Sequence, residues 1–235
     1  MRERMSQPLP QARAAIFDLD GTLLDTLGDL ADSVNVALEE NGHPVHREEV
    51  ICGFIGDGAE SLMRRALPQG VAGEAGAVAA CLESFKVHYA GNYANRTRPY
   101  PGIIETLEEL GRRGIPLGIL SNKPHAFTVE CARAFFGEPG KRFGVVFGQR
   151  EGVPKKPDPA GALEVARGLG TAPSECLYVG DSAVDMQTAI SAGMIPVGVA
   201  WGFRSPAELR DAGAREVIED ASQLLTAFSR QGAED

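Results

Sequence analysis

Short apolar runs that end in polar clusters alternate with amphipathic segments along most of this chain of 235 residues. Five such runs are present, at 14–17, 116–120, 145–147, 177–179 and 196–200. Short apolar runs of this kind are typical of strands buried on both faces. The segments between them carry apolar residues at helical spacing, as at Ile103, Leu107 and Leu110. Strand alternating with helix predicts an α/β fold, in which helices cover both faces of a parallel sheet.

One region breaks the alternation, because residues 25–96 show helical patterns and no convincing strand. Three apolar stripes at helical spacing occupy it, at 27–38, 62–67 and 78–89. The first stripe stops at Asn41-Gly42, which is a typical helix end. We therefore expect an all-helical domain at 25–96, inserted into a core domain made of 1–24 and 97–235.

Charge and cysteine usage limit the classes of partner. The formal net charge is -9 and there is no basic run, which argues against nucleic acid or an anionic membrane as a partner. The four cysteines lie far apart without metal-binding spacing, so reduced, structural thiols are expected. Residues 1–12 lack the apolar segment of a signal peptide, and no run could span a membrane. These features predict a cytoplasmic protein with a loose N-terminal extension. The expected assembly is a monomer or a homodimer, between which the sequence does not choose.

Asp18 and Asp20 directly follow the first apolar run and precede Gly21 and Thr22. A period of two would point both carboxylates to the same side of the strand. Two carboxylates held so close repel each other unless a proton or a cation lies between them. A strand followed by an ordinary Asp-Gly turn is the alternative interpretation of this motif alone.

A second acidic pair, Asp181 and Asp185, follows the apolar run at 177–179. The two are one helical turn apart, so both can face the strand end if a helix begins near Ser182. Oxygen-rich clusters without histidine suit a hard cation such as Mg²⁺. Taken alone, the motif is better interpreted as an ordinary helix N-cap at Asp181.

Two more motifs follow apolar runs. Ser121 and Asn122 come after the run at 116–120 and could hold a phosphate oxygen, although both residues also cap helices. Lys156 precedes Pro157 in a loop ahead of a predicted helix, where its charge could neutralise a carboxylate and phosphoryl oxygens together. Paired lysines in a loop are otherwise usually solvated.

In combination, these four motifs resemble the haloacid dehalogenase superfamily. Its pattern is DxDGT, then S/T-N, then K-P, then GDxxxD, and the chain meets it in full over nearly its whole length. The resemblance implies a Rossmann-like parallel sheet core, and the helical insertion falls where this family places a C1 cap. The implied enzyme is a Mg²⁺-dependent phosphatase, a phosphoric monoester hydrolase of small phosphorylated metabolites.

The resemblance also implies the roles of individual residues. Asp18 would be the nucleophile that forms an aspartyl-phosphate, and Asp20 the general acid and base. Mg²⁺ would be held by the Asp18 carboxylate, the backbone carbonyl of Asp20, and Asp181, with Asp185 in or near that shell. The implied phosphate-binding residues are Thr22, Ser121, Asn122 and Lys156. Dehalogenases lack the acid/base carboxylate, so Asp20 favours phosphoryl transfer.

The sequence of the predicted cap narrows the range of expected substrates. Its residues Gly56, Gly58, Leu62 and 65–67 are similar to a G-x-G-x3-L-x2-R-A-L stretch of bacterial phosphoglycolate phosphatases, and the 121–124 segment is similar to their T-N-K-P. Arg65 would then reach a substrate carboxylate, although a helical arginine more often faces solvent. The alternatives are a phosphomutase similar to β-phosphoglucomutase, a pyrophosphatase or another small-phosphate hydrolase. A phosphate-binding protein without turnover is the remaining class.

Overall fold

A six-stranded parallel sheet forms the centre of the protein, which is described by a computed structural model over residues 9–138 and 140–228. The strand order is β5-β4-β1-β6-β7-β8. The strands are β1 (Ala14–Phe17), β4 (Leu117–Pro124), β5 (Val145–Gln149), β6 (Cys176–Gly180), β7 (Ile195–Val199) and β8 (Glu216–Ile218). The predicted α/β fold is confirmed, and each of the five apolar runs overlaps a strand of this sheet.

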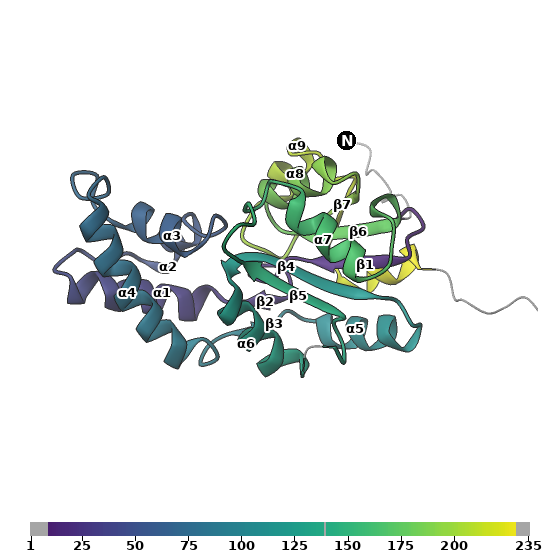
Figure 1. The fold of residues 1–235 in the computed structure, drawn as a ribbon, viewed down its shortest axis with the longest axis horizontal. Coiled ribbons are helices and arrows are strands. Elements are labelled where there is room, and N and C mark those ends of the chain that lie inside the picture. The colour runs from purple at the N-terminus through teal and green to yellow at the C-terminus, as the bar shows by residue number, and fades with distance from the viewer. Residues whose placement is uncertain (1–8, 139, 229–235) are drawn as a thin grey trace, which may run out of the picture.

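Helices cover both faces of the sheet (Figure 1). On one face lie α7 (Ala160–Gly168), α8 (Ala183–Ser191) and α9 (Pro206–Asp211), and on the other α5 (Ile103–Arg112) and α6 (His125–Phe136). Two 3-10 segments complete the core, η1 (Pro173–Glu175) and η2 (Ala221–Ala227). Strand side chains alternate between the two layers, since Phe17 packs in the cluster that includes α5 and Ile16 in the cluster that includes α7.

Four helices lie together to one side of the sheet, on the left in Figure 1. They are α1 (Leu27–Glu40), α2 (Glu48–Cys52), α3 (Ala59–Ala66) and α4 (Ala75–Asn92), and we call residues 27–92 the helical unit. The unit buries an apolar cluster of its own, with Leu38, Met63 and Phe85 among its members. The chain enters and leaves it through β2 (Leu24–Asp25) and β3 (Arg98–Pro99), which pair antiparallel.

The N-terminal segment is more ordered at its end than the expected loose extension. Residues 1–8 of the expected loose extension lie outside the described residues, but Leu9 is buried in the core and the Ala12 N–H donates to the Ala227 carbonyl at 2.9 Å. The end of the predicted extension is therefore packed. Within the described part of the chain, every helix is too short or too polar to cross a lipid bilayer.

Candidate functional site

The polar motifs meet where β4, β1 and β6 end. These three strands are neighbours in the sheet, with Phe17 of β1 in register with Ile119 of β4 and Val179 of β6. Because the strands are parallel, their carboxyl ends lie at one edge, which is where open α/β sheets bind ligands. Asp18, Ser121 and Asp181 are therefore brought together from positions more than 50 residues apart in the chain.

Three carboxylates form what we call the acid cluster: Asp18, Asp181 and Asp185. One oxygen of each lies within 4.8 Å of the others, and all three side chains are buried. The helix carrying Asp185 begins as predicted, with Ser182 as the N-cap of α8. Ser182 and Asp185 form a capping box, in which Asp185 Oδ2 accepts from the Ser182 N–H at 3.1 Å, and the same oxygen also accepts from the Ser182 hydroxyl at 2.6 Å. Asp185 thus combines an N-terminal helix role with membership of the cluster.

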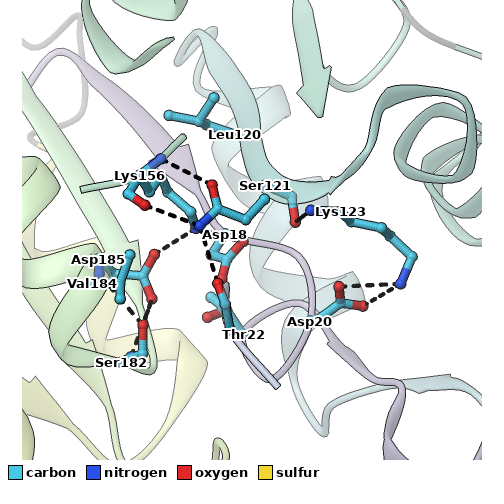
Figure 2. A network of polar contacts seen from close by, with 12 residues as sticks. Asp18, Asp20, Thr22, Leu120, Ser121, Lys123, Lys156, Ser182, Val184 and Asp185 are labelled. Carbon is cyan, nitrogen blue, oxygen red and sulfur yellow. Dashed lines mark hydrogen bonds and ion pairs between the residues drawn. The ribbon is translucent and has the colours of Figure 1, made fainter. Parts of the chain in front are cut away.

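Lys156 lies against this cluster (Figure 2). Its Nζ is 2.7 Å from Asp185 Oδ1 and 2.9 Å from Asp18 Oδ1. Burial disfavours the ammonium, but the Asp18 and Asp185 carboxylates outweigh that effect and hold the pKa of Lys156 well above its usual value. Lys156 therefore stays charged beside the two carboxylates.

One lysine cannot balance three carboxylates. Burial raises the pKa of Asp18 to about 7, although Lys156 opposes this and Asp185 adds to it. Burial also raises the pKa of Asp181, helped by its neighbours Asp185 and Asp18. The cluster consequently favours an additional positive charge, either a proton or a cation.

The donor set suits a divalent oxygen-preferring cation. Asp18 Oδ1 is buried and pairs with Lys156 Nζ at 2.9 Å, and the same Nζ also pairs with Asp185. Three buried carboxylates beside one ammonium leave negative charge uncompensated, which is costly unless another group binds it. Carboxylate oxygens are the preferred ligands of Mg²⁺. Asp18, Asp181 and Asp185 could therefore supply such an ion with ligands.

Gly21 is required for this packing. Its φ of +83° is a conformation that residues with a Cβ rarely adopt, and a Cβ there would lie 2.3 Å from Asp181 Oδ2. The turn after β1 can approach Asp181 only because this position has no side chain. The glycine of the Asp-Gly turn therefore belongs to the site as well as to the turn.

Asp20 departs from the expectation that its carboxylate points to the same side as that of Asp18. It lies beyond the end of β1, in the turn, so the alternation of a strand no longer sets its direction. Its two oxygens instead accept from Lys123 Nζ at 2.9 and 3.1 Å, away from the acid cluster (Figure 2). Lys123 Nζ also lies 4.5 Å from the centre of the Tyr89 ring, which comes from α4.

The predicted phosphate-binding residues differ in their surroundings. Ser121 lines the cavity described below, and its Oγ accepts from the Lys123 N–H at 3.2 Å. The amide of Asn122 is engaged by the backbone, because Nδ2 donates to the Gly56 and Lys156 carbonyls and Oδ1 accepts from the Lys156 N–H at 2.9 Å. Thr22 is fully buried, and its hydroxyl donates to Asp181 Oδ1 at 3.4 Å.

Arg65 is not brought to the site. Leu62, Met63 and Ala66 form the buried face of α3, which turns Arg65 toward solvent. Its guanidinium pairs with Asp57 and donates to the Phe54 carbonyl at 3.0 Å. The geometry gives no support to the expected contact between Arg65 and a substrate carboxylate.

A cavity, which we call the chamber, separates the strand ends from the helical unit. Asp18, Asp20 and Ser121 line it from the sheet, and Leu30, Leu62 and Phe85 line it from the helical unit.

Two cations of the chamber wall, Lys123 and Arg204, were not predicted as site residues. A charged residue shortly after a predicted strand was the available signal for both, because ligands bind at strand ends.

Comparison with known proteins agrees with the family resemblance seen in the sequence motifs. A family model described as haloacid dehalogenase-like hydrolase matches residues 12–193. A phosphoglycolate phosphatase of Mannheimia succiniciproducens is 36% identical over 214 residues, which cover 89% of this chain and 95% of the relative.

Two solved structures have a similar fold. One is of a protein from Lactobacillus delbrueckii subsp. bulgaricus, with a TM-score of 0.83, 33% identity, and coverage of 91% of this chain and 97% of that one. The other is of a predicted phosphoglycolate phosphatase from Haemophilus somnus, with a TM-score of 0.82, 29% identity, and coverage of 92% and 98%.

Proposed function

This chain belongs to the haloacid dehalogenase-like hydrolases and is a phosphatase, and from that premise we propose that it hydrolyses small phosphate monoesters through an aspartyl-phosphate on Asp18. The observation that carries the proposal is the position of Asp18. It lines the chamber, and its Oδ1 pairs with the Lys156 ammonium at 2.9 Å. A carboxylate that lines the cavity beside a fixed ammonium is placed to act as a nucleophile toward phosphorus.

The proposed covalent step divides one hydrolysis into two displacements. An oxygen of Asp18 bonds to phosphorus while the ester oxygen leaves, and water then attacks the same phosphorus and releases Asp18. Asp20, which also lines the chamber, would protonate the leaving oxygen and later accept a proton from the water. Microscopic reversibility makes one carboxyl group sufficient for both transfers.

Phosphoryl oxygens would be held by the Ser121 hydroxyl and the Lys156 ammonium. Lys156 is already charged and fixed between Asp18 and Asp185, so it would need little reorganisation when the phosphoryl group arrives. Asn122 would support it by holding the Lys156 backbone at both N–H and C=O. Thr22 would act through its contact with Asp181.

We propose Mg²⁺ as the cofactor, bound by Asp18, the backbone carbonyl of Asp20, and Asp181, with Asp185 in or near that shell. When bound, the ion would supply the positive charge that lets an anionic phosphate approach an anionic carboxylate. The acid cluster and its raised carboxyl pKa values support this assignment.

The relatives named phosphoglycolate phosphatase make 2-phosphoglycolate the first substrate to test. Residues 25–96 would act as a cap domain over a core domain formed by 1–24 and 97–235, and would shape the pocket for the leaving group. All four cysteines are free, as expected of a protein of the reducing cytoplasm, which we propose as its location.

The test is phosphate release from a panel of 2-phosphoglycolate, pyrophosphate, pyridoxal phosphate and nucleoside monophosphates, with Mg²⁺ or with EDTA. We expect Mg²⁺-dependent release and a fall of roughly 10³-fold or more in Asp18→Asn. The variant should keep its fold, since one of three repelling carboxylates is removed. Asp211→Asn, at an exposed position of α9, is the control.

Three results would contradict parts of this proposal. Substantial activity in Asp18→Asn would exclude Asp18 as the nucleophile. No release from any member with Mg²⁺ present would favour a phosphate-binding protein. Isomerisation of a sugar 1-phosphate without phosphate release would instead indicate a phosphomutase.

A further inference from the structure

The loop that follows β7, residues 201–204, is attached to the core at the acid cluster. Trp201 Nε1 donates to the Thr22 carbonyl at 3.0 Å, and the Phe203 N–H donates to Asp181 Oδ2 at 2.7 Å. Gly202 fits tightly between these contacts, because a Cβ there would lie 2.2 Å from Asp181 Cβ. The position of this loop is therefore tied to that of Asp181.

The next residue of the same loop reaches the helical unit. Arg204 Nη1 donates to the Cys52 carbonyl at 3.0 Å, and its Nη2 donates to the Ile55 carbonyl at 2.7 Å and approaches the Gly53 carbonyl at 3.5 Å. These carbonyls lie at the end of α2 and just beyond it. One planar guanidinium thus holds a short segment of the helical unit by its backbone.

The segment held by Arg204 leads directly into the chamber wall. Ile55 and Gly56 line the chamber, and the Gly56 carbonyl also accepts from Asn122 Nδ2 at 3.1 Å. The segment is therefore fixed to the core from two sides, by Arg204 and by Asn122.

We propose that Arg204 is a positioning residue that holds the 52–56 segment of the helical unit against the core, so that the chamber wall is fixed relative to Asp181. The Phe203 N–H binds Asp181, and Arg204 binds the helical unit. The loop at 201–204 therefore connects the chamber wall to the acid cluster. Nothing in this proposal requires Arg204 to contact substrate.

The contacts of Arg204 favour a positioning role over direct binding of a substrate anion. Nη1 and Nη2 both donate to backbone carbonyls, and Nε lies 3.8 Å from Glu208 Oε1. A guanidinium so engaged would have to break these bonds to bind a carboxylate or phosphate of the substrate. Its donors serve the protein's own backbone.

The effect on the segment can be measured by amide hydrogen exchange in the full-length protein. The Gly53 and Phe54 N–H groups donate to the Val50 and Ile51 carbonyls, so their exchange reports on local opening. We expect faster exchange at these two amides in Arg204→Met, an intermediate rate in Arg204→Lys, and unchanged exchange in β1. An ammonium can bind fewer of the carbonyls at once, which accounts for the intermediate rate.

Kinetics supply the second readout, which rests on the proposed function. In Arg204→Met we expect kcat/KM for the best ester of the panel to fall, by up to roughly 10²-fold for a displaced wall. Arg204→Lys should recover part of this loss, and Mg²⁺ affinity should change little because the Phe203 N–H still holds Asp181. Arg210→Met, at an exposed arginine of α9, should match the wild type in every measurement.

Hydrogen exchange tests the positioning role of Arg204, and phosphate release tests the proposed function, so failure of one can be told from failure of the other. Unchanged exchange at Gly53 and Phe54 in Arg204→Met overturns the proposal, and so does an equal rise throughout the core strands, which would indicate a general loss of stability. If Arg204→Met does not fold, exchange in Arg204→Lys decides in the same way. If no ester is hydrolysed by the wild type, the proposed function fails, while hydrogen exchange still tests the position of the segment.

Discussion

Lys123 and Asp20 form a buried ion pair on the chamber wall, in which the lysine side chain is 4% exposed and the aspartate 13%. In Lys123→Met the Asp20 carboxylate would lose its cation while remaining largely buried. We expect the free energy of unfolding to fall by about 3 kcal/mol, as when one partner of a buried pair is removed. We also expect kcat/KM to fall, because Asp20 would no longer be held in place. Urea unfolding and phosphate release measure the two effects.

A double-mutant cycle separates the pair from the packing of the lysine stem. The Asp20→Asn change in the Lys123→Met background removes the unpaired charge, so we expect the double variant to be more stable than Lys123→Met alone. Equal costs of Lys123→Met with and without the Asp20 charge would contradict the assigned interaction. Lys123→Arg, which keeps a cation, should lose less stability than Lys123→Met.

At the scale of the elements, Asp29 joins the start of the helical unit to the chain that leaves it. It lies in the first turn of α1, is 1% exposed, and accepts from the Arg96 N–H, the Thr97 N–H and the Thr97 hydroxyl at 2.7–2.8 Å. Asp29→Asn replaces one acceptor oxygen with a donor. We expect unfolding to become easier by about 2–3 kcal/mol, measured in urea.

Asp32 provides a matched control on the same helix. It pairs with the Arg96 guanidinium at 3.1 Å, but both side chains are about half exposed. Asp32→Asn should therefore cost no more than about 0.5 kcal/mol. Similar losses in the two variants would show that Asp29 is not an anchor of the helical unit.

At the scale of the whole molecule, the acid cluster links stability to pH and to Mg²⁺. Because the folded-state pKa of Asp18 is about 7 against an ordinary value of 3.8, the folded protein binds the extra proton between these values. In the metal-free protein this group should therefore destabilise the fold progressively as pH rises from about 4 to about 7. A cation that replaces the proton should offset the loss.

The measurement is Tm at pH 5 and pH 8, in EDTA and in Mg²⁺. We expect the gain in Tm on adding Mg²⁺ to be larger at pH 8, because at pH 5 the ion competes with protons on Asp18. Asp18→Asn should reduce the difference between the two pH values. A larger gain at pH 5 in the wild type would contradict a cation site at this cluster.

Most elements were predictable because their signals are local. Continuous apolar runs marked β1 and β4–β7, and helical stripes marked α1, α3 and α4. Two of the short elements were not predicted: β8, which has three residues at the sheet edge with partial exposure, and α2, which has only five residues. Elements this short carry too few residues for a periodic pattern to stand out.

The sequence by itself determined the chemical groups and the strand ends that carry them. Asp18, Ser121, Lys156 and Asp181 converge as expected, because parallel strands bring their carboxyl ends to one edge.

The partner that each side chain takes depends on how the chain folds as a whole. Asp20 turns to Lys123, 103 residues away, and Arg204 reaches Ile55, 149 residues away. Arg65 faces outward because the buried face of α3 is fixed by its neighbours. Such choices depend on burial and charge supplied by distant segments, and no local pattern contains them.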